Sequence, residues 1–258
     1  MNVSLGDQTV FLAFWLSFSR WVAVLFQLPL FDNVIVPNIV KVLSSFLISY
    51  AFFPLVQGTL VAEIKLVGVD NIWLLIMFHT TTGLIIGFLV KCIMSLFVAA
   101  GSLLTMQIGY SQVSYFDPTQ GQQVGPFERL VEWTMLILIL SSGALVPMFK
   151  GVFLSFFSVN FLNADKMLKT PEYFVLFFKS AFSASILLAG PLIFANLLMN
   201  LVMGIVARTI PQMNVLMVSF VVNIGLGLLL FLGIAEEFFQ VSYDLYLEKL
   251  GEWFQFFT

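Results

Sequence analysis

Few side chains in this 258-residue chain could carry out catalysis. His79 is the only histidine and Cys92 the only cysteine, and neither an HExxH nor a GxSxG arrangement occurs. A serine beside His79 could form a hydrolytic dyad, but a single histidine on an apolar helix is more often a hydrogen-bonded packing residue. We therefore expect no enzymatic activity, no cofactor, no metal site and no internal disulfide.

The charged residues do not form the pattern of an ion pump or a small-solute transporter. Carboxylates gather in the expected connections and near the C-terminus, so we expect none to face another within an apolar segment. Proton and ion pathways in membranes use paired charges at mid-span, and stand-alone transporters often use broken helices there. The basic residues in apolar segments have no evident acidic partners: Arg20, Lys41, Lys91 and Lys179.

A ridge of polar and small residues crosses an otherwise apolar segment. Asn196, Asn200, Gly204 and Arg208 recur at every fourth position, which places them on one face of a helix. An amide or guanidinium group in hydrocarbon costs several kcal/mol when it lacks a partner. We expect this ridge to face other helices, a neighbouring subunit or a water-filled cavity.

The ridge ends in a turn that predicts a helical hairpin. Arg208 complements the helix dipole at a C-terminus, and Pro211 is suited to the start of the next helix because its missing N–H would be unpaired there. Gln212 and Asn214 could return hydrogen bonds to the first helix.

Residues 106–126 form a loop with unusual chemistry. Gly109 and the Asp117-Pro118 step disfavour a continuous helix, whereas the aromatic side chains are too apolar for an ordinary solvated loop. Two interpretations stay open: an interfacial connection anchored by aromatic residues, or a constriction that projects into a channel. The residues of interest are Met106, Gln107, Gly109, Tyr110, Tyr115, Phe116, Asp117 and Pro118.

The C-terminal segment 236–258 has the pattern of an amphipathic helix. Its polar face is acidic, and membrane-surface helices usually carry Lys and Arg instead, so the pattern favours docking on protein. The alternative is a helix that folds back on its own bundle. The apolar face consists of Phe239, Tyr243, Tyr246, Leu250, Trp253 and Phe257.

Composition places the chain in a membrane or in a very apolar complex. It is 60% hydrophobic and only 10% charged, with a mean hydropathy of +1.02. The net charge of -3, without a basic stripe, argues against nucleic acid, so lipid and protein are the expected partners. We predict an all-α membrane protein in which 1–258 form one domain.

Six long apolar segments account for most of the chain. The third is nearly 60 Å long as one helix, about twice the hydrocarbon core, so it forms either two spans around Lys91 or a single long helix. Gly83 with Gly87, and Gly225 with Gly227, indicate close helix packing. The six segments are Val10–Phe31, Ile39–Val56, Ile72–Tyr110, Trp133–Phe149, Tyr173–Met203 and Gln212–Ala235.

These residues resemble the FliR family of export-gate proteins, which serves flagella and also virulence injectisomes. The strongest match is Ala207-Arg-Thr-Ile-Pro-Gln-Met-Asn214, preceded by Pro191 and Asn196. Further matches run from Gly101 through Gln107-Ile-Gly109 to Phe116-Asp117-Pro118. The family usually continues after the turn with Gly-Phe-Pro and a Lys, whereas this chain reads Ser219-Phe220-Val-Val-Asn223, so no role for that Pro or Lys transfers here.

The resemblance implies a non-enzymatic subunit of a flagellar export channel in the bacterial inner membrane, at the basal body. Its implied partners are FliP, FliQ and FlhB, and its implied cargo is unfolded protein. Family members wind as bent hairpins held largely above the bilayer plane, and the loop at Gln107–Pro118 resembles their pore-closing loop, with Tyr110, Tyr115 and Phe116 as the seal. The equivalent subunit of an injectisome remains the alternative.

Overall fold

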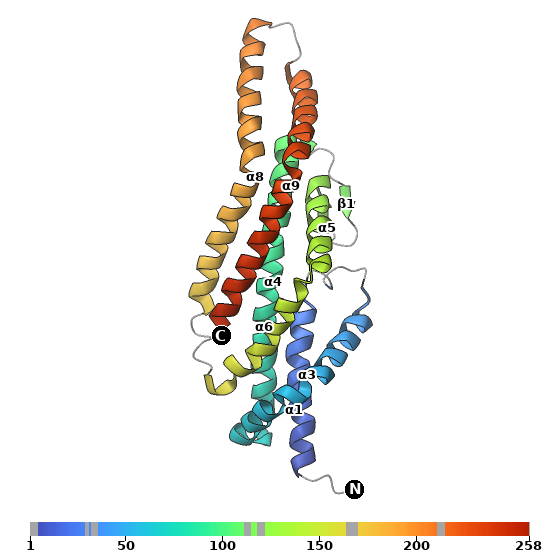
Figure 1. Ribbon diagram of the computed structural model, residues 1–258, viewed down its shortest axis with the longest axis vertical. Helices are drawn as coiled ribbons and strands as arrows, with labels where there is room; N and C mark the ends of the chain where they lie inside the picture. The colour runs from blue at the N-terminus through green and yellow to red at the C-terminus, as the bar shows by residue number, and fades with distance from the viewer. Residues whose placement is uncertain are drawn as a thin grey trace. The chain divides into compact units, whose positions relative to one another are not determined.

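The computed structural model describes residues 5–28, 31, 36–110, 115–117, 122–163, 170–210 and 215–257 (Figure 1). Long helices dominate it, which confirms the all-α class. Short 3-10 turns cover Val69–Asn71 (η1) and Phe161–Asn163 (η3), and a two-stranded hairpin joins β1 (Tyr115–Asp117) to β2 (Gln122–Val124). The helices are α1 (Leu5–Leu25), α3 (Asn38–Val67), α4 (Ile72–Ile108), α5 (Pro126–Ser141), α6 (Leu145–Ser158), α8 (Thr170–Thr209) and α9 (Val215–Phe257).

The chain divides into two compact units built from interleaved segments. The first comprises Met1–Cys92, Gly143–Val175 and Lys249–Thr258, and the second comprises Ile93–Ser142 and Leu176–Glu248. Each unit therefore has its own packed interior, which combines stretches far apart in the sequence. That all of 1–258 act as one domain stays a prediction.

The structure decides the continuity of three segments for which the sequence made a prediction. The third segment is a single helix, α4, of 37 residues, so the alternative of two spans around Lys91 is wrong. The predicted C-terminal amphipathic helix is not separate, because α9 runs unbroken for 43 residues. The fourth segment is two helices, α5 and α6, separated by a break where Gly143 takes a φ of 72°.

Several of these helices are long and apolar enough to cross a bilayer. Within the described residues five meet that test, and the bent pair α5–α6 makes a sixth if it counts as one span. This agrees with the six apolar segments. Length and composition are thus those of a membrane-embedded helical protein.

Glycines let α1 and α4 approach closely in the first unit. A Cβ at Gly83 would lie 2.5 Å from the carbonyl oxygen of Arg20, and one at Gly87 would lie 2.9 Å from that of Val24. Both contacts are with backbone, which cannot swing aside as a side chain can. The expectation of close helix packing at this pair is confirmed.

Aromatic side chains fill the interior of the first unit. The fully buried Trp21 on α1 stacks on Phe52 of α3, with ring centroids 5.5 Å apart. Phe149 and Phe156 of α6 lie 6.0 and 6.4 Å from the same indole ring. These contacts join α1, α3 and α6 around one large buried side chain.

We predict that Gly83→Ala destabilises the protein by about 1–3 kcal/mol, because the new methyl group has no space beside the Arg20 carbonyl. The matched control is Gly58→Ala on α3, where an added Cβ meets nothing within 4 Å. There a gain of roughly 0.5–1 kcal/mol is expected from helix propensity. Thermal unfolding in detergent measures both, and equal midpoints for the two variants would contradict the close packing.

Candidate functional site

The base of the predicted loop is held by an amide cluster. Gln107 lies in the last turn of α4, and the Asn196 side-chain amide on α8 donates to the Gln107 backbone carbonyl and, at 2.9 Å, to its side-chain oxygen. Asn200 donates in turn to the Asn196 oxygen at 2.8 Å. Two of the four ridge residues, Asn196 and Asn200, therefore form hydrogen bonds within the second unit.

A small cavity adjoins this amide cluster. It has a volume of about 40 Å³ and is lined by Gln107, Asn196 and Asn223 together with apolar residues of α8 and α9. The Asn223 side-chain oxygen is buried and has no hydrogen-bond partner among the described residues. The size and the polar lining suit an ordered water. Nearby, a Cβ at Gly227 would lie 2.8 Å from Ile108, so α9 also meets the end of α4 closely.

The loop begins at a glycine and continues into a row of aromatic rings. Gly109 ends α4 with a φ of 86°, a conformation that favours glycine. Tyr110 then packs edge-on against Phe127 of α5 at 5.9 Å, and Phe127 packs against Phe231 of α9 at 5.1 Å. The start of the loop is thus tied to two other helices.

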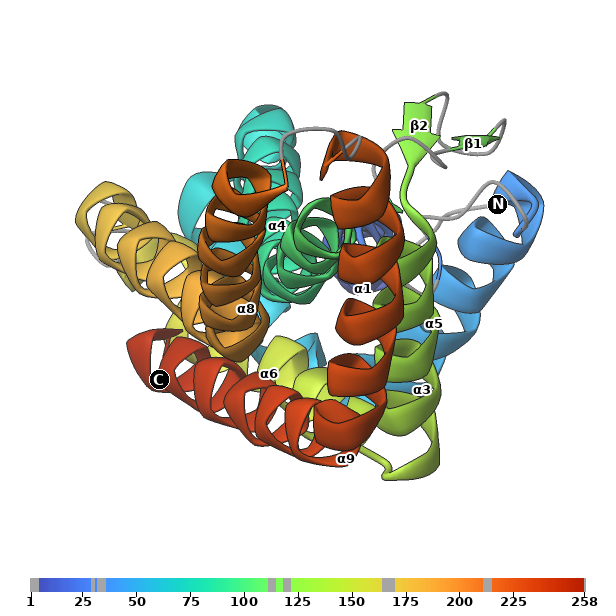
Figure 2. The same cartoon turned by 90° about the horizontal axis from the view of Figure 1, so that it is seen from above.

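Part of the loop forms the β-hairpin, which the sequence pattern did not predict. Tyr115 pairs with Val124, Phe116 with Gln123 and Asp117 with Gln122, in antiparallel register. Figure 2 shows β2 leading directly toward α5. Of the predicted loop residues, Pro118 lies outside the described part of the chain.

The loop returns to α4 through two further close approaches. A Cβ at Gly125 would lie 2.6 Å from the Thr105 side chain, and one at Gly101 would lie 2.9 Å from the Glu128 backbone. The Gly125 N–H also donates to the Glu128 carboxylate at 3.3 Å. Both ends of the loop are therefore fixed on α4.

The rest of the ridge faces outward. Gly204 and Arg208 are exposed, and Arg208 has no ion pair or hydrogen bond among the residues that the structure describes. The remaining predicted turn residues, Pro211, Gln212 and Asn214, lie outside those residues. Binding of a partner to the cationic end of the ridge stays a prediction.

The last turns of α9 show the predicted amphipathic pattern. Phe239 and Tyr243 are half-buried, and Tyr246, Leu250 and Trp253 are buried, whereas the acidic face is exposed. In the first unit, the neighbouring Phe254 ring lies directly against Gly151. This stretch covers part of its own chain, as the alternative interpretation expected. Docking of this helix on another protein, including through Phe257, stays a prediction.

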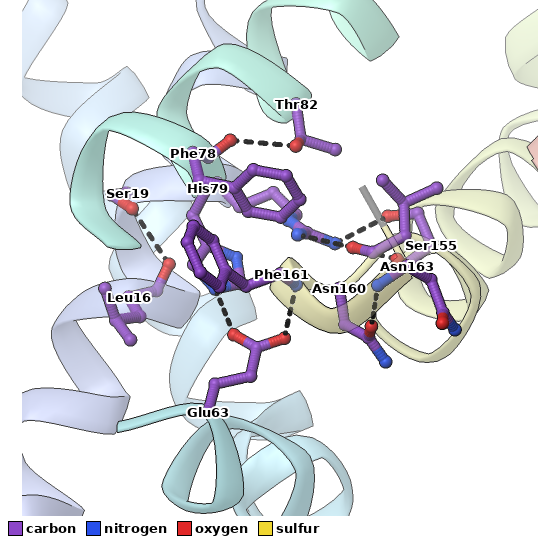
Figure 3. A network of polar contacts seen from close by, with 12 residues as sticks. Leu16, Ser19, Glu63, Phe78, His79, Thr82, Ser155, Asn160, Phe161 and Asn163 are labelled. Carbon is purple, nitrogen blue, oxygen red and sulfur yellow. Dashed lines mark hydrogen bonds and ion pairs between the residues drawn. The ribbon is translucent and has the colours of Figure 1, made fainter. Parts of the chain in front are cut away.

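The sequence pattern missed a buried polar network in the first unit (Figure 3). Glu63 of α3 is only 1% exposed, and its carboxylate lies 2.8 Å from the His79 Nε2 on α4. Its other oxygen accepts the Phe161 backbone N–H at 3.2 Å. Glu63 is thus an exception to the expectation that carboxylates gather in connections and near the C-terminus, because it lies within helix α3.

Arg20 of α1 belongs to the same network and is fully buried. Its guanidinium donates to the Ser155 carbonyl at 2.8 Å and to the Val159 carbonyl at 3.0 Å, and lies 4.3 Å above the Phe156 ring. These carbonyls belong to the end of α6, where the helix dipole is negative, and the Ser155 carbonyl also accepts the Val159 N–H at 3.0 Å. Glu63 supplies the compensating negative charge, so Arg20 does have an acidic counterpart.

The network accounts for the packing and the hydrogen bond of His79. His79 packs on Phe156 with ring planes 25° apart, and its hydrogen bond goes to Glu63 rather than to a serine. The prediction of a hydrogen-bonded packing histidine is confirmed. Glu63 could have been recognised by its apolar neighbours on α3, but its proximity to Lys65 suggested a connection instead.

Comparisons with known proteins agree over most of the chain. The family described as "Bacterial export proteins, family 1" matches residues 11–248. The flagellar biosynthetic protein FliR of Aquifex aeolicus is 28% identical over 84% of this chain and 83% of its own, and that of Bacillus subtilis is 26% identical over 90% and 89%. The Yop proteins translocation protein T of Yersinia pestis is 28% identical over 57% of this chain and 58% of its own.

We predict that Glu63→Gln lowers the free energy of unfolding by about 3–5 kcal/mol, because it leaves the buried Arg20 charge uncompensated. Glu237→Gln on the exposed side of α9 is the matched control and should change little. Arg20→Met combined with Glu63→Leu should recover part of the loss, since no single charge is then stranded. Chemical denaturation in detergent measures all three, and a neutral Glu63→Gln would contradict this role of the network.

Proposed function

Since the chain belongs to the bacterial export proteins, family 1, we propose that it is a structural pore subunit of the flagellar type III protein export gate. In this proposal it lies in the bacterial inner membrane at the flagellar basal body. It conducts unfolded flagellar proteins and performs no chemistry on them. Flagellar relatives that match most of the chain support this choice.

The anchored loop is the observation that carries the gating role. Its first end is held by the Gln107–Asn196 hydrogen bonds, and its second end by the close approach of Gly125 to Thr105. A segment with fixed ends and an aromatic middle is suited to narrowing a channel. Residues Tyr110, Tyr115 and Phe116 are the proposed seal, which a substrate or an assembly partner displaces.

Unpartnered apolar surfaces support assembly with other subunits. In the most apolar 18-residue stretch of α8, only 17% of the residues are buried, and in that of α9 only 11%. The corresponding share for the stretch within Val69–Ile108 is 61%. The exposed Arg208 lies at one end of α8. A large apolar surface with one cation at its edge suits a neighbouring helix with an acidic or amide side chain. FliP and FliQ are the proposed neighbours, with FlhB as a further contact.

A virulence injectisome is the second candidate setting, favoured by the similarity to the Yersinia pestis translocation protein. The two settings share the pore role and differ in cargo. Deletion of the gene separates them, because a flagellar subunit is required for motility and for filament export. A motile deletion strain that fails to secrete effectors would overturn the flagellar assignment.

The first functional prediction concerns the loop. Deleting Ser111–Tyr115 should raise ion leakage through the assembled complex without abolishing assembly, because the amide cluster and Gly125 contacts remain. Conductance in planar bilayers measures the leak. Replacing the same residues by a glycine-serine segment of equal length tests whether the leak depends on the Tyr115 side chain or on the length of the loop. Unchanged conductance in an assembled complex would count against the seal.

The second functional prediction concerns the ridge. Arg208→Ala and Asn200→Leu should each reduce recovery of FliP and FliQ with the tagged protein, because both positions are exposed on α8. Lys179→Ala is the matched control, an exposed cation near the other end of the same helix, and should leave recovery unchanged. Normal co-purification with both ridge variants would remove α8 as the assembly surface.

A further inference from the structure

An apolar groove runs along α1 and α4 in the first unit. It has a volume of about 520 Å³, within the range of small-molecule sites. At ~1.5 Å per residue, the stretch of α1 from Trp15 to Phe26 is about 16 Å long, close to half of the ~30 Å hydrocarbon core. The groove is therefore as long as one leaflet is deep. Its walls include Trp15, Phe18, Phe26, Ile76, Thr80 and Leu84.

A positive charge lies beside Phe26, the residue that lines one end of this groove. The Lys41 ammonium lies 5.6 Å from the centre of the Phe26 ring, and Lys41 is only 6% exposed. Within the described part of the chain, Lys41 has no ion pair and its ammonium donates no hydrogen bond. A cation in the first turn of a helix is unfavourable because it opposes the dipole. Helix stability therefore does not explain this lysine.

The helix that carries Lys41 starts without a cap. Pro37 precedes α3, and no side chain of the described residues bonds to its first turn. The Val40 and Lys41 N–H groups share the Pro37 carbonyl, at 2.9 and 3.4 Å. The Asn38 and Ile39 N–H groups have no acceptor among the described residues and are the first-turn donors left for an anion. Side chains on a helix lean toward its N-terminus, which brings the Lys41 ammonium toward these donors, and a cation beside free helical N–H groups suits a phosphate.

We propose that this groove binds one anionic phospholipid. The phosphate is held by Lys41 and the first turn of α3, and one acyl chain lies along α1 and α4 toward Trp15. The lining is apolar apart from Ser19 and Thr80, which suits a flexible hydrocarbon chain. The end of the groove at Phe26 is then at the membrane surface.

This site is independent of the pore role. The family resemblance implies a subunit held largely above the bilayer. A lipid at α3 would identify the part of this chain that contacts the bilayer. The lipid would also fix the depth of α1 and α4 through their shared groove. Loss of the site would leave the loop and its anchors unchanged, because those lie in the other unit.

Trp15 provides the measurement, because it lines the groove and is 43% exposed. The complex is reconstituted in phosphatidylcholine vesicles that contain a minor fraction of phosphatidylglycerol brominated on its acyl chains. Bromine quenches indole fluorescence at contact, and subtraction of a Trp15→Phe variant isolates the signal. We expect brominated phosphatidylglycerol to quench at about fivefold lower content than brominated phosphatidylcholine, the effect of one lysine on an anionic lipid. Equal quenching by the two lipids would overturn the proposal.

Variants test which residues of the site produce the preference for phosphatidylglycerol. Lys41→Gln should remove the preference for phosphatidylglycerol, and Lys41→Arg should keep it. Lys65→Gln, at the exposed other end of α3, is the matched control and should also keep it. Thr80→Phe should fill the groove and abolish quenching by both lipids. A preference that persists in Lys41→Gln, or quenching that persists in Thr80→Phe, would overturn the assignment.

Two further arms test other occupants. Excess inorganic phosphate should not restore the Trp15 fluorescence, because it lacks the acyl chain. Full recovery of the fluorescence with phosphate alone would show a phosphate site and overturn the proposal of a lipid site. Quenching in the isolated chain that disappears in the recovered complex would show that a neighbouring subunit covers the groove. That result would likewise overturn the proposal, whereas quenching that persists in the complex supports it.

Discussion

Polar groups inside a chain this apolar must find partners in protein, because lipid offers none. Both units obey that constraint by different means. In the first, Arg20 is held by carbonyls at the end of α6 and balanced by Glu63. In the second, the Asn196 side-chain amide donates a hydrogen bond to Gln107. The charged network fixes helices to one another, while the amide pair fixes the start of a loop.

Local pattern predicts where the long apolar helices lie and which face of α9 is exposed, but not every helix end and break. The acidic face of α9 is exposed because its period of three to four residues determines which side is polar. The continuity of α4 follows from the absence of proline between Leu55 and Asp117. The bend between α5 and α6 was missed, since Ser-Ser-Gly is a weak break signal and only the positive φ of Gly143 reveals it.

Long-range pairing is what local pattern could not supply. Glu63 and His79 are separated by 16 positions and Gln107 and Asn196 by 89, so only the folded chain brings them together. The sequence predicts that the ridge needs hydrogen-bond partners. Periodicity does not reveal that Asn196 finds its partner in Gln107, at the base of the loop. The β-hairpin is similar, because its register depends on where both ends of the loop are fixed.

If the loop gates a pore as proposed, its fixed ends determine which part of it moves most easily. Moving its base requires breaking the Gln107–Asn196 hydrogen bonds and separating Gly125 from Thr105. The hairpin between them has three residue pairs, and an isolated two-stranded hairpin is at best marginally stable in water. In the proposed gating role, opening would therefore cost least at β1 and β2 and most at α4. The loop would then return to the same position, because its anchors stay on the helix.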